Sequence, residues 1–147
     1  MCGIAGFSLF QPCSLPEMHH LAALMGTAIS HRGPDSAGTW ANTELAVALA
    51  HQRLAILDLT AAGHQPMHST SGRFVIIFNG EIYNHLTVRR ELEANGFPVA
   101  WQGHSDTETL LAAIEAWGLD SAMQRCVGMW AIALVDRQER RLQLSRD

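Results

Sequence analysis

The sequence predicts one domain of mixed α and β structure in which helices are layered on sheets. Its apolar segments alternate between strand-like and helix-like periods, and no repeat, low-complexity tract or interdomain linker interrupts its 147 residues. Hydrophobic residues make up 48% of the chain, enough for a domain of this size to bury roughly two-thirds of its unfolded surface. Because two helices fall between the strand pairs, each sheet has an element to pack against.

The first half of the chain predicts strand, helix, loop and strand in that order. A strand is expected over Cys2–Phe10 and a helix over Leu15–Ile29, since Pro16 suits the first turn of a helix. His31–Asp35 must then be a loop, and Leu45–His51 is the next strand. Four apolar residues at helical spacing mark the expected buried face of the first helix: Leu21, Leu24, Met25 and Ala28.

The second half predicts a strand, two helices and a hairpin. The strand is Arg73–Phe78, and the helix after it begins near Asn84 and stops at Asn95-Gly96. Ser105–Glu108 fits the S-x-x-E capping box, which opens a second helix ending at Gly118. One face of that helix is expected to be Leu110, Leu111, Ile114 and Trp117. The last two strands, joined by a charged turn, are Met129–Asp136 and Arg141–Leu144.

Composition argues against a nucleic-acid or membrane protein. The formal charge is −4, from 14 acidic residues and 10 arginines with no lysine, and no basic patch is evident. The longest apolar run, Phe74–Phe78, is far too short to cross a bilayer, and the N-terminus lacks the features of a signal peptide. We therefore expect a cytoplasmic protein with neither a nucleic-acid nor a membrane partner.

Cysteine and histidine spacing predicts neither disulfides nor a metal site. Cys2, Cys13 and Cys126 are odd in number and form no C-x-x-C pair, so reduced thiols are expected, with the latter two as packing residues. His64 and His68 flank Pro66 and cannot share a helix face as zinc-binding pairs do. No metal ligand is therefore assigned.

Cys2 is the first candidate for chemistry because it follows the initiator methionine. Removal of Met1 would leave a thiol and a free amine on one residue. An α-amino group titrates near ~7.7–8.0 and a free thiol near ~8.5, so the neutral amine can take the thiol proton. A cysteine buried in a strand is the structural alternative, and position alone does not separate the two.

Asn79–Asn84 follows the apolar strand and is the second candidate. Asn-Gly is a common hairpin turn. In the functional interpretation, the Asn79 amide and the Gly80 N–H are the donors that an oxyanion hole requires, and removing one such donor typically costs on the order of 10²–10³ in rate.

Three charged residues are candidates for substrate binding. Arg53 lies among apolar neighbours, where it needs an anionic partner or an exit to water. Its functional interpretation is a fork that holds a substrate carboxylate through two hydrogen bonds. Glu81 and Asp106 supply negative charge for a substrate ammonium, although Asp106 is equally well explained as a helix-capping residue.

Six strings in order along the whole chain closely resemble one family. They are Met1–Gly6, His31–Asp35, Arg53–Asp58, Gly63–Met67, Asn79–Asn84 and Ser105–Glu108. Together they resemble the class II glutamine amidotransferase domain of glutamine-hydrolysing asparagine synthetases. The Asn79–Asn84 string is similar to the asparagine synthetase branch, whereas Asp35–Gly38 has some likeness to the aminosugar-forming branch.

The resemblance implies an α+β N-terminal-nucleophile hydrolase fold, a four-layer αββα sandwich with two antiparallel sheets between helical layers. It implies that Cys2 attacks the amide carbon of L-glutamine while Asn79 and Gly80 hold the oxyanion. The substrate-binding residues that it implies are Arg53, Leu54, Ala55, Ile56, Leu57, Glu81 and Asp106. Arg32 and Asp35 are expected to have a lid or structural role.

The resemblance also implies that residues 1–147 are a glutaminase domain, apparently cut inside its own C-terminal end, with the synthetase domain absent. No cofactor is expected in this domain, because ATP and magnesium belong to the missing synthetase domain, which would be its partner; a homodimer is also possible. Three functions stay open. The ammonia serves asparagine synthesis, it feeds another acceptor such as a sugar acid, or the chain is a non-catalytic interaction module.

Overall fold

The computed structural model describes residues 2–11 and 13–147 and contains two antiparallel sheets. The three-stranded sheet has the order β1–β3–β2 and consists of β1 (Gly3–Ser8), β3 (Val47–Arg53) and β2 (Ser36–Asn42). The four-stranded sheet has the order β4–β5–β6–β7 and consists of β4 (Met67–His68), β5 (Phe74–Ile82), β6 (Gly128–Asp136) and β7 (Arg141–Arg146). All of the pairings are antiparallel.

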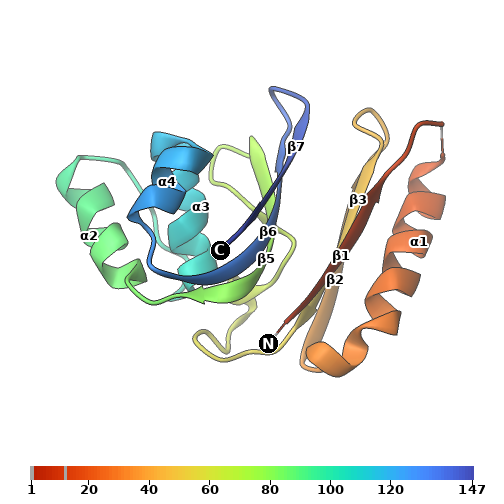
Figure 1. The fold of residues 1–147 in the computed structure, drawn as a ribbon, viewed down its shortest axis with the longest axis horizontal. Coiled ribbons are helices and arrows are strands. Elements are labelled where there is room, and N and C mark those ends of the chain that lie inside the picture. Colours follow the sequence, from red (N-terminus) through yellow and green to blue (C-terminus); the bar gives the residue numbers. More distant parts are fainter. Residues whose placement is uncertain (1, 12) are drawn as a thin grey trace.

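Helices cover the outer faces of both sheets. They are α1 (Leu15–Ala28), α2 (His85–Ala94), α3 (Asp106–Trp117) and α4 (Leu119–Arg125), with short 3₁₀ helices η1 (Ser30–Arg32) and η2 (Ala61–Gly63). Figure 1 shows α1 on the three-stranded sheet, α2, α3 and α4 on the other sheet, and the two sheets facing each other between them. The predicted four-layer sandwich is therefore confirmed. No helix in the described part of the chain has both the length and the apolar character needed to cross a bilayer.

The core between the sheets is built by alternate residues of facing strands. Val47 and Leu49 of β3 pack with Val75 and Ile77 of β5 and with two residues of β6, Ala133 and Val135. Since side chains alternate along a strand, His51 and Arg53 continue the inward-facing row of β3 beyond this core. The apolar row thus ends in two polar residues at one end of the sheet interface.

The predicted buried face of α1 is wrong. Leu21, Leu24, Met25 and Ala28 are exposed, whereas Met18, Ala22 and Gly26 are buried against the sheet. The sheet presents small side chains there, including Ala48 and Ala50, so a close approach favours the smaller stripe of the helix. Periodicity identified a helix, and the partner surface decided which face it buries.

Most of the other predicted helices and strands are present, but their ends differ from the prediction. The hairpin of β6 and β7 is confirmed, and α3 begins after Ser105, whose hydroxyl accepts the Glu108 N–H at 3.1 Å. The reciprocal half of the predicted capping box is not formed in the described residues, because the Glu108 carboxylate accepts from Gln102 and Gly103 instead. β2, β4 and α4 were not predicted; they are short or half-exposed and carry weak periodicity.

Candidate active site

Strand pairing places Cys2 beside Arg53 at one end of the sheet interface. In the β1–β3 register Gly3 lies opposite Gln52, so Cys2 and Arg53 are the next pair beyond the ladder. The Cys2 thiol contacts the backbone of Leu54, with Sγ 3.4 Å from the amide nitrogen, which donates to it, and 3.6 Å from the carbonyl oxygen. The Arg32 Nε donates to the Cys2 carbonyl at 3.1 Å. The chain start is thus held from two sides.

A pocket of about 100 Å³ opens at Cys2 and contains most of the predicted site residues. The predicted residues that line it are Cys2, Arg53, Leu54, Ile56, Leu57, Gly80, Glu81 and Asp106. Ala55 and Asn79 do not line it. The other lining residues are Asp58, Gly63, Gln65, Phe78, Ser105, Thr107 and Met129. One cavity therefore brings together a cysteine, an arginine and three carboxylate residues, Asp58, Glu81 and Asp106, from distant parts of the chain.

The Gly80 N–H is an uncommitted donor at this pocket. Alternate backbone groups of a strand point to opposite edges, and the Phe78 and Ile82 N–H groups point away from β6, to Gln65 Oε1 at 2.6 Å and Asp106 Oδ2 at 2.9 Å. The Gly80 N–H lies between them with the same orientation. No side chain in the described part of the chain accepts from it, and β4 pairs only with Val75 and Ile76.

Asn79-Gly80 is not a hairpin turn, because both residues lie inside β5 and pair with Ala131 and Trp130 of β6. A side chain at Gly80 has no space, since an added Cβ would lie 2.7 Å from the Trp130 Cα and closer still to the Met129 carbonyl. Glycine here lets the two strands stay in register beside the pocket.

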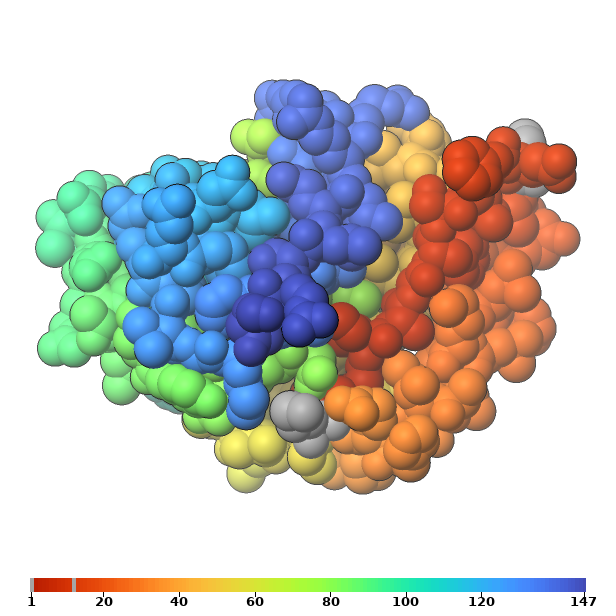
Figure 2. Space-filling model, in the orientation of Figure 1, coloured from red at the N-terminus to blue at the C-terminus, as the bar shows by residue number. Residues whose placement is uncertain are grey.

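Asn79 lines a second hollow of about 320 Å³ that shares Gly80 and Met129 with the first. Its Oδ1 is buried without a hydrogen-bond partner among the described residues, and no described contact uses its amide nitrogen. The other lining residues are Trp130, Ala131, Arg146 and Asp147. Figure 2 shows the last residues of the chain, in dark blue, on the face where the first strand, in red, begins.

Among residues 2–11 and 13–147, no carboxylate forms an ion pair with Arg53, and its side chain does not reach water as the sequence suggested. Its side chain is buried, with the residue 9% exposed, and it donates through Nη1 to the Thr60 carbonyl at 2.8 Å and through Nη2 to the Asp58 carbonyl. A guanidinium has five N–H donors. In the described structure two of them are used, so three remain for a ligand in the pocket.

The segment from Leu54 to Gly63 forms one wall of the pocket and is anchored by two carboxylates. Asp35 Oδ2 accepts the Ala55 N–H at 2.8 Å, which places Asp35 as a structural residue of the wall. Asp58 accepts from the hydroxyl and N–H of Thr60 and from the His104 N–H. The Thr60 hydroxyl, followed by those N–H groups, lowers the pKa of Asp58 to about 2.

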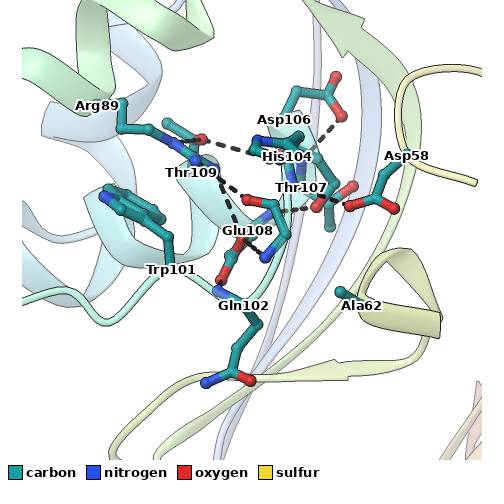
Figure 3. A network of polar contacts seen from close by, with 12 residues as sticks. Asp58, Ala62, Arg89, Trp101, Gln102, His104, Asp106, Thr107, Glu108 and Thr109 are labelled. Atoms are coloured by element: carbon teal, nitrogen blue, oxygen red, sulfur yellow. Dashed lines mark hydrogen bonds and ion pairs between the residues drawn. The ribbon is translucent and has the colours of Figure 1, made fainter. Parts of the chain in front are cut away.

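The loop that Asp58 reaches is itself held by α2 and α3 (Figure 3). Glu108 accepts the N–H groups of Gln102 and Gly103 at 2.6 and 3.1 Å. The Arg89 guanidinium stacks 3.8 Å from the centre of the Trp101 ring and donates to the Gly103 carbonyl. The pocket wall is therefore tied through Asp58 to a hydrogen-bonded loop directly before α3.

The two predicted ammonium-binding carboxylates differ in environment. Asp106 is 6% exposed, and its oxygens accept the N–H groups of Ile82 and Thr107 at 2.9 and 2.8 Å. Burial raises the pKa of Asp106 despite these bonds. Glu81 is exposed at the pocket, and no described hydrogen bond uses its carboxylate. Both retain acceptor capacity toward the pocket.

Sequence reasoning gave no role to three residues that shape the site, namely Asp58, Gly63 and Gln65. Gln65 connects the Phe78 N–H to the Thr107 hydroxyl. An added Cβ at Gly63 would lie 2.9 Å from the Arg53 Cζ, so glycine makes room for the guanidinium. All three belong to strings that carry the family resemblance, which was the only signal available for them.

Comparisons with known proteins identify the family of the chain. A family model described as a glutamine amidotransferase domain matches residues 1–147. A putative asparagine synthetase (glutamine-hydrolyzing) of Mycobacterium bovis is 38% identical over 160 residues, covering 100% of this chain and 24% of that protein. Asparagine synthetase (glutamine-hydrolyzing) 1 of Bacillus subtilis is 35% identical over 148 residues, covering 100% of this chain and 22% of that protein. The chain thus spans about a quarter of these relatives.

Two further matches concern the fold of the chain and the range of proteins related to it. A glutamine phosphoribosylpyrophosphate amidotransferase structure from B. subtilis has a TM-score of 0.52 at 22% identity and covers 63% of this chain and 21% of that chain, which supports the fold alone. Amidase chry2 of Gibberella zeae is 36% identical over 119 residues, covering 81% of this chain and 17% of that protein. The chain belongs to the glutamine amidotransferase family, as a class II domain with the N-terminal-nucleophile hydrolase fold that is homologous to glutamine-hydrolysing asparagine synthetases.

Proposed function

We propose that this domain hydrolyses L-glutamine to glutamate and ammonia. The Cys2 thiolate attacks the side-chain amide carbon, and the resulting oxyanion accepts hydrogen bonds from the Gly80 N–H and the Asn79 amide. The tetrahedral intermediate expels ammonia after the leaving nitrogen gains a proton, and water then cleaves the thioester to release glutamate and restore the thiol. The observation that carries this proposal is the uncommitted Gly80 N–H in a pocket shared with Cys2 and Arg53.

In this proposal the pocket recognises both charged groups of the amino acid. The free donors of Arg53 bind the α-carboxylate, and Glu81 with Asp106 binds the α-ammonium. The wall beside them is formed by Leu54, Ala55, Ile56 and Leu57. The opposite charges of these groups in one pocket support this orientation. Ala55 contributes through its backbone, which Asp35 holds, because it does not line the pocket.

The use of the ammonia depends on chain outside residues 1–147. The relatives named as glutamine-hydrolyzing asparagine synthetases support asparagine synthesis as the use of the ammonia. In this proposal aspartate is the acceptor, and ATP and magnesium are bound by a synthetase domain that would be the partner of this one. The second candidate is another acceptor such as a sugar acid, and the relative amidase chry2 is not named as an asparagine synthetase. Identifying the ammonia-consuming domain by sequencing beyond Asp147 tests the choice between them. A homodimer and a cytoplasmic location stay predictions.

The covalent step is tested by changing the nucleophile alone. We expect Cys2→Ala and Cys2→Ser to abolish glutamate release while leaving glutamine binding largely intact. In the proposal Cys2 is the nucleophile, and other residues of the pocket bind the substrate. Glutamate release and glutamine binding are measured separately, by a coupled assay and by calorimetry. Appreciable glutamate release by Cys2→Ala would refute the assignment. An inactive wild-type protein that still binds glutamine would indicate the non-catalytic module.

The role of the chain terminus is tested through Met1, which lies outside the described residues. We expect a protein that retains Met1 to be inactive, because the Cys2 amine is then part of a peptide bond and cannot accept a proton. Mass spectrometry measures the trimmed fraction, and activity should rise in proportion to it. The rate should also rise with pH through an amine titrating near ~8. Full activity with Met1 present on every chain would mean that another group is the base.

A further inference from the structure

Two buried side chains hold the peptide groups of Phe78, the residue directly before the Asn79 and Gly80 donors. Gln65 Oε1 accepts the Phe78 N–H at 2.6 Å, and His51 Nε2 lies 3.2 Å from the Phe78 carbonyl oxygen. His51 and Gln65 are 1% and 5% exposed. His51 lies on β3 and Gln65 lies between η2 and β4, so both ends of one peptide residue are fixed from outside its own strand.

These contacts matter because, in the described part of the chain, β5 has no partner strand at this edge beyond Ile76. β4 pairs with Val75 and Ile76 and goes no further, so beyond that point only side chains satisfy the outward backbone groups of β5. Gln65 serves Phe78 and Asp106 serves Ile82. Between them the Gly80 N–H is left open to the pocket.

Each of the two side chains is restricted to one orientation. The Gln65 amide nitrogen donates to the Thr107 hydroxyl at 3.2 Å, so its oxygen is directed to Phe78. A carbonyl oxygen only accepts, so the His51 Nε2 must carry the proton and donate. Burial, and secondarily the positive charge of nearby His64 and Arg53, lowers the pKa of His51 to about 4 despite the Phe78 bond, which keeps the ring neutral at neutral pH.

We propose that His51 and Gln65 are positioning residues that fix the Phe78 peptide and thereby set the Gly80 and Asn79 donors at the correct distance from Cys2. The inference rests on the proposed glutamine hydrolysis. A donor displaced by about 1 Å loses much of its value, and misplacements of that size can reduce a rate by on the order of 10². His51 does not line the pocket, and the described hydrogen bonds of Gln65 go to Phe78 and Thr107.

The test compares isosteric variants with a matched control. His51→Met removes the one hydrogen bond to the Phe78 carbonyl, and Gln65→Met removes two, from the Phe78 N–H and to the Thr107 hydroxyl. His51→Gln keeps a donor near the Nε2 position. Gln52→Met is the control, because Gln52 is also a buried amide on β3 but faces α1. In protein with Met1 removed, we expect kcat to fall about 10- to 100-fold in the two methionine variants, with KM changing less, and His51→Gln to recover part of the loss.

A second measurement separates donor placement from damage to the nucleophile. Alkylation of Cys2 by iodoacetamide is a displacement at a saturated carbon that builds no oxyanion, so its rate should stay within about twofold of wild type in every variant that folds. The alkaline rise of the kcat profile should also keep its midpoint, because the base is unchanged. A shifted midpoint would make His51 an acid-base group and overturn the positioning role.

The outcomes distinguish this inference from the proposed function. If the wild-type protein releases no glutamate, the proposed hydrolysis fails and the inference falls with it. If the wild type is active but the His51→Met and Gln65→Met variants match Gln52→Met in kcat, only the inference is overturned. Equal losses in His51→Gln and His51→Met would likewise overturn it. Should His51→Met not fold by circular dichroism, Gln65→Met and His51→Gln decide the question on the same criteria.

Discussion

Replacing Arg53 by lysine tests whether this buried cation binds the substrate carboxylate or only holds the pocket wall. The guanidinium donates to the Asp58 and Thr60 carbonyls and has three further N–H groups without a described acceptor, and Arg53 lines the pocket. A lysine ammonium is a single point charge on a flexible stem and cannot face two carbonyls and a carboxylate in one plane. Both functions of Arg53 are therefore weakened in Arg53→Lys.

The expected magnitudes follow from the hydrogen bonds that lysine cannot make. A hydrogen bond to a charged group contributes about 1.5–3 kcal/mol. Because about 1.4 kcal/mol is a factor of ten, the absence of one such bond to the substrate should raise KM about 10- to 150-fold. A wall carbonyl left without its donor should also lower the free energy of unfolding by about 1–3 kcal/mol.

The assay compares two substrates in both proteins. Glutamine carries the α-carboxylate, and 4-aminobutanamide has the same side-chain amide and amine without it. If Arg53 binds the carboxylate, the wild-type protein should strongly prefer glutamine, and Arg53→Lys should lose most of that preference. Product release is followed as ammonia for both substrates, and thermal unfolding reports the change in stability. Arg90→Lys is the control, because Arg90 is exposed and makes its contacts within α2.

An equal penalty for both substrates would refute carboxylate binding by Arg53. That result would mean that Arg53 acts only through the wall segment and that another group binds the carboxylate. An unchanged KM for glutamine together with a lower unfolding temperature would lead to the same conclusion.

Three further predictions concern neighbouring positions. Gly63→Ala places a Cβ 2.9 Å from the Arg53 Cζ, so the guanidinium must move and KM for glutamine should rise about tenfold, as measured by steady-state kinetics. Asp58 has a folded-state pKa of about 2, below the ~3.9 of an unfolded chain. Its contribution to the free energy of unfolding is therefore present above pH ~4 and is lost as the pH falls toward 2. The free energy of unfolding of Asp58→Asn, measured by denaturant titration, should depend less on pH in that window. Arg32→Met removes the donor to the Cys2 carbonyl, and kcat should fall about tenfold with little change in thermal stability.

Simple outcomes would contradict each of these three. For Gly63, the control is Ala61→Ser, which adds an atom to the same turn at an exposed position; an equal KM in both variants would show that the guanidinium does not need the space. For Asp58, the contradicting result is an Asp58→Asn stability curve parallel to wild type between pH 4 and 2. For Arg32, it is an unchanged kcat.

Much of the candidate site could be predicted from sequence because its residues occur in recognisable strings. Cys2, Arg53, Gly80 and Asp106 come from four separate strings, and one pocket brings them together. What could not be predicted is which hydrogen-bond partners and strand pairings each of these residues has. Asn79-Gly80 is also a typical hairpin signal, and only the β5–β6 pairing shows that it continues a strand.

The errors in the fold arose where local pattern and packing disagree. Leu21, Leu24 and Met25 made a convincing apolar stripe on α1, yet the helix buries Met18, Ala22 and Gly26 instead. Ala22 and Gly26 let the helix approach Ala48 and Ala50 of the sheet closely, and this preference is a property of the pair of surfaces. The α3 face was predicted correctly, with Leu110, Leu111 and Ile114 buried, because large apolar residues meet large apolar residues there.

The sequence by itself therefore determined the family, the order of most elements and the candidates for the reactive and charged residues, because these depend on residue types and on spacing along the chain. Tertiary structure alone decided which donors are free. Strand pairing turns the Gly80 N–H toward the pocket, and side chains from other elements occupy the N–H groups on either side of it. Whether a backbone group is available depends on what lies across from it in space, and contacts between distant segments are not encoded in any local pattern.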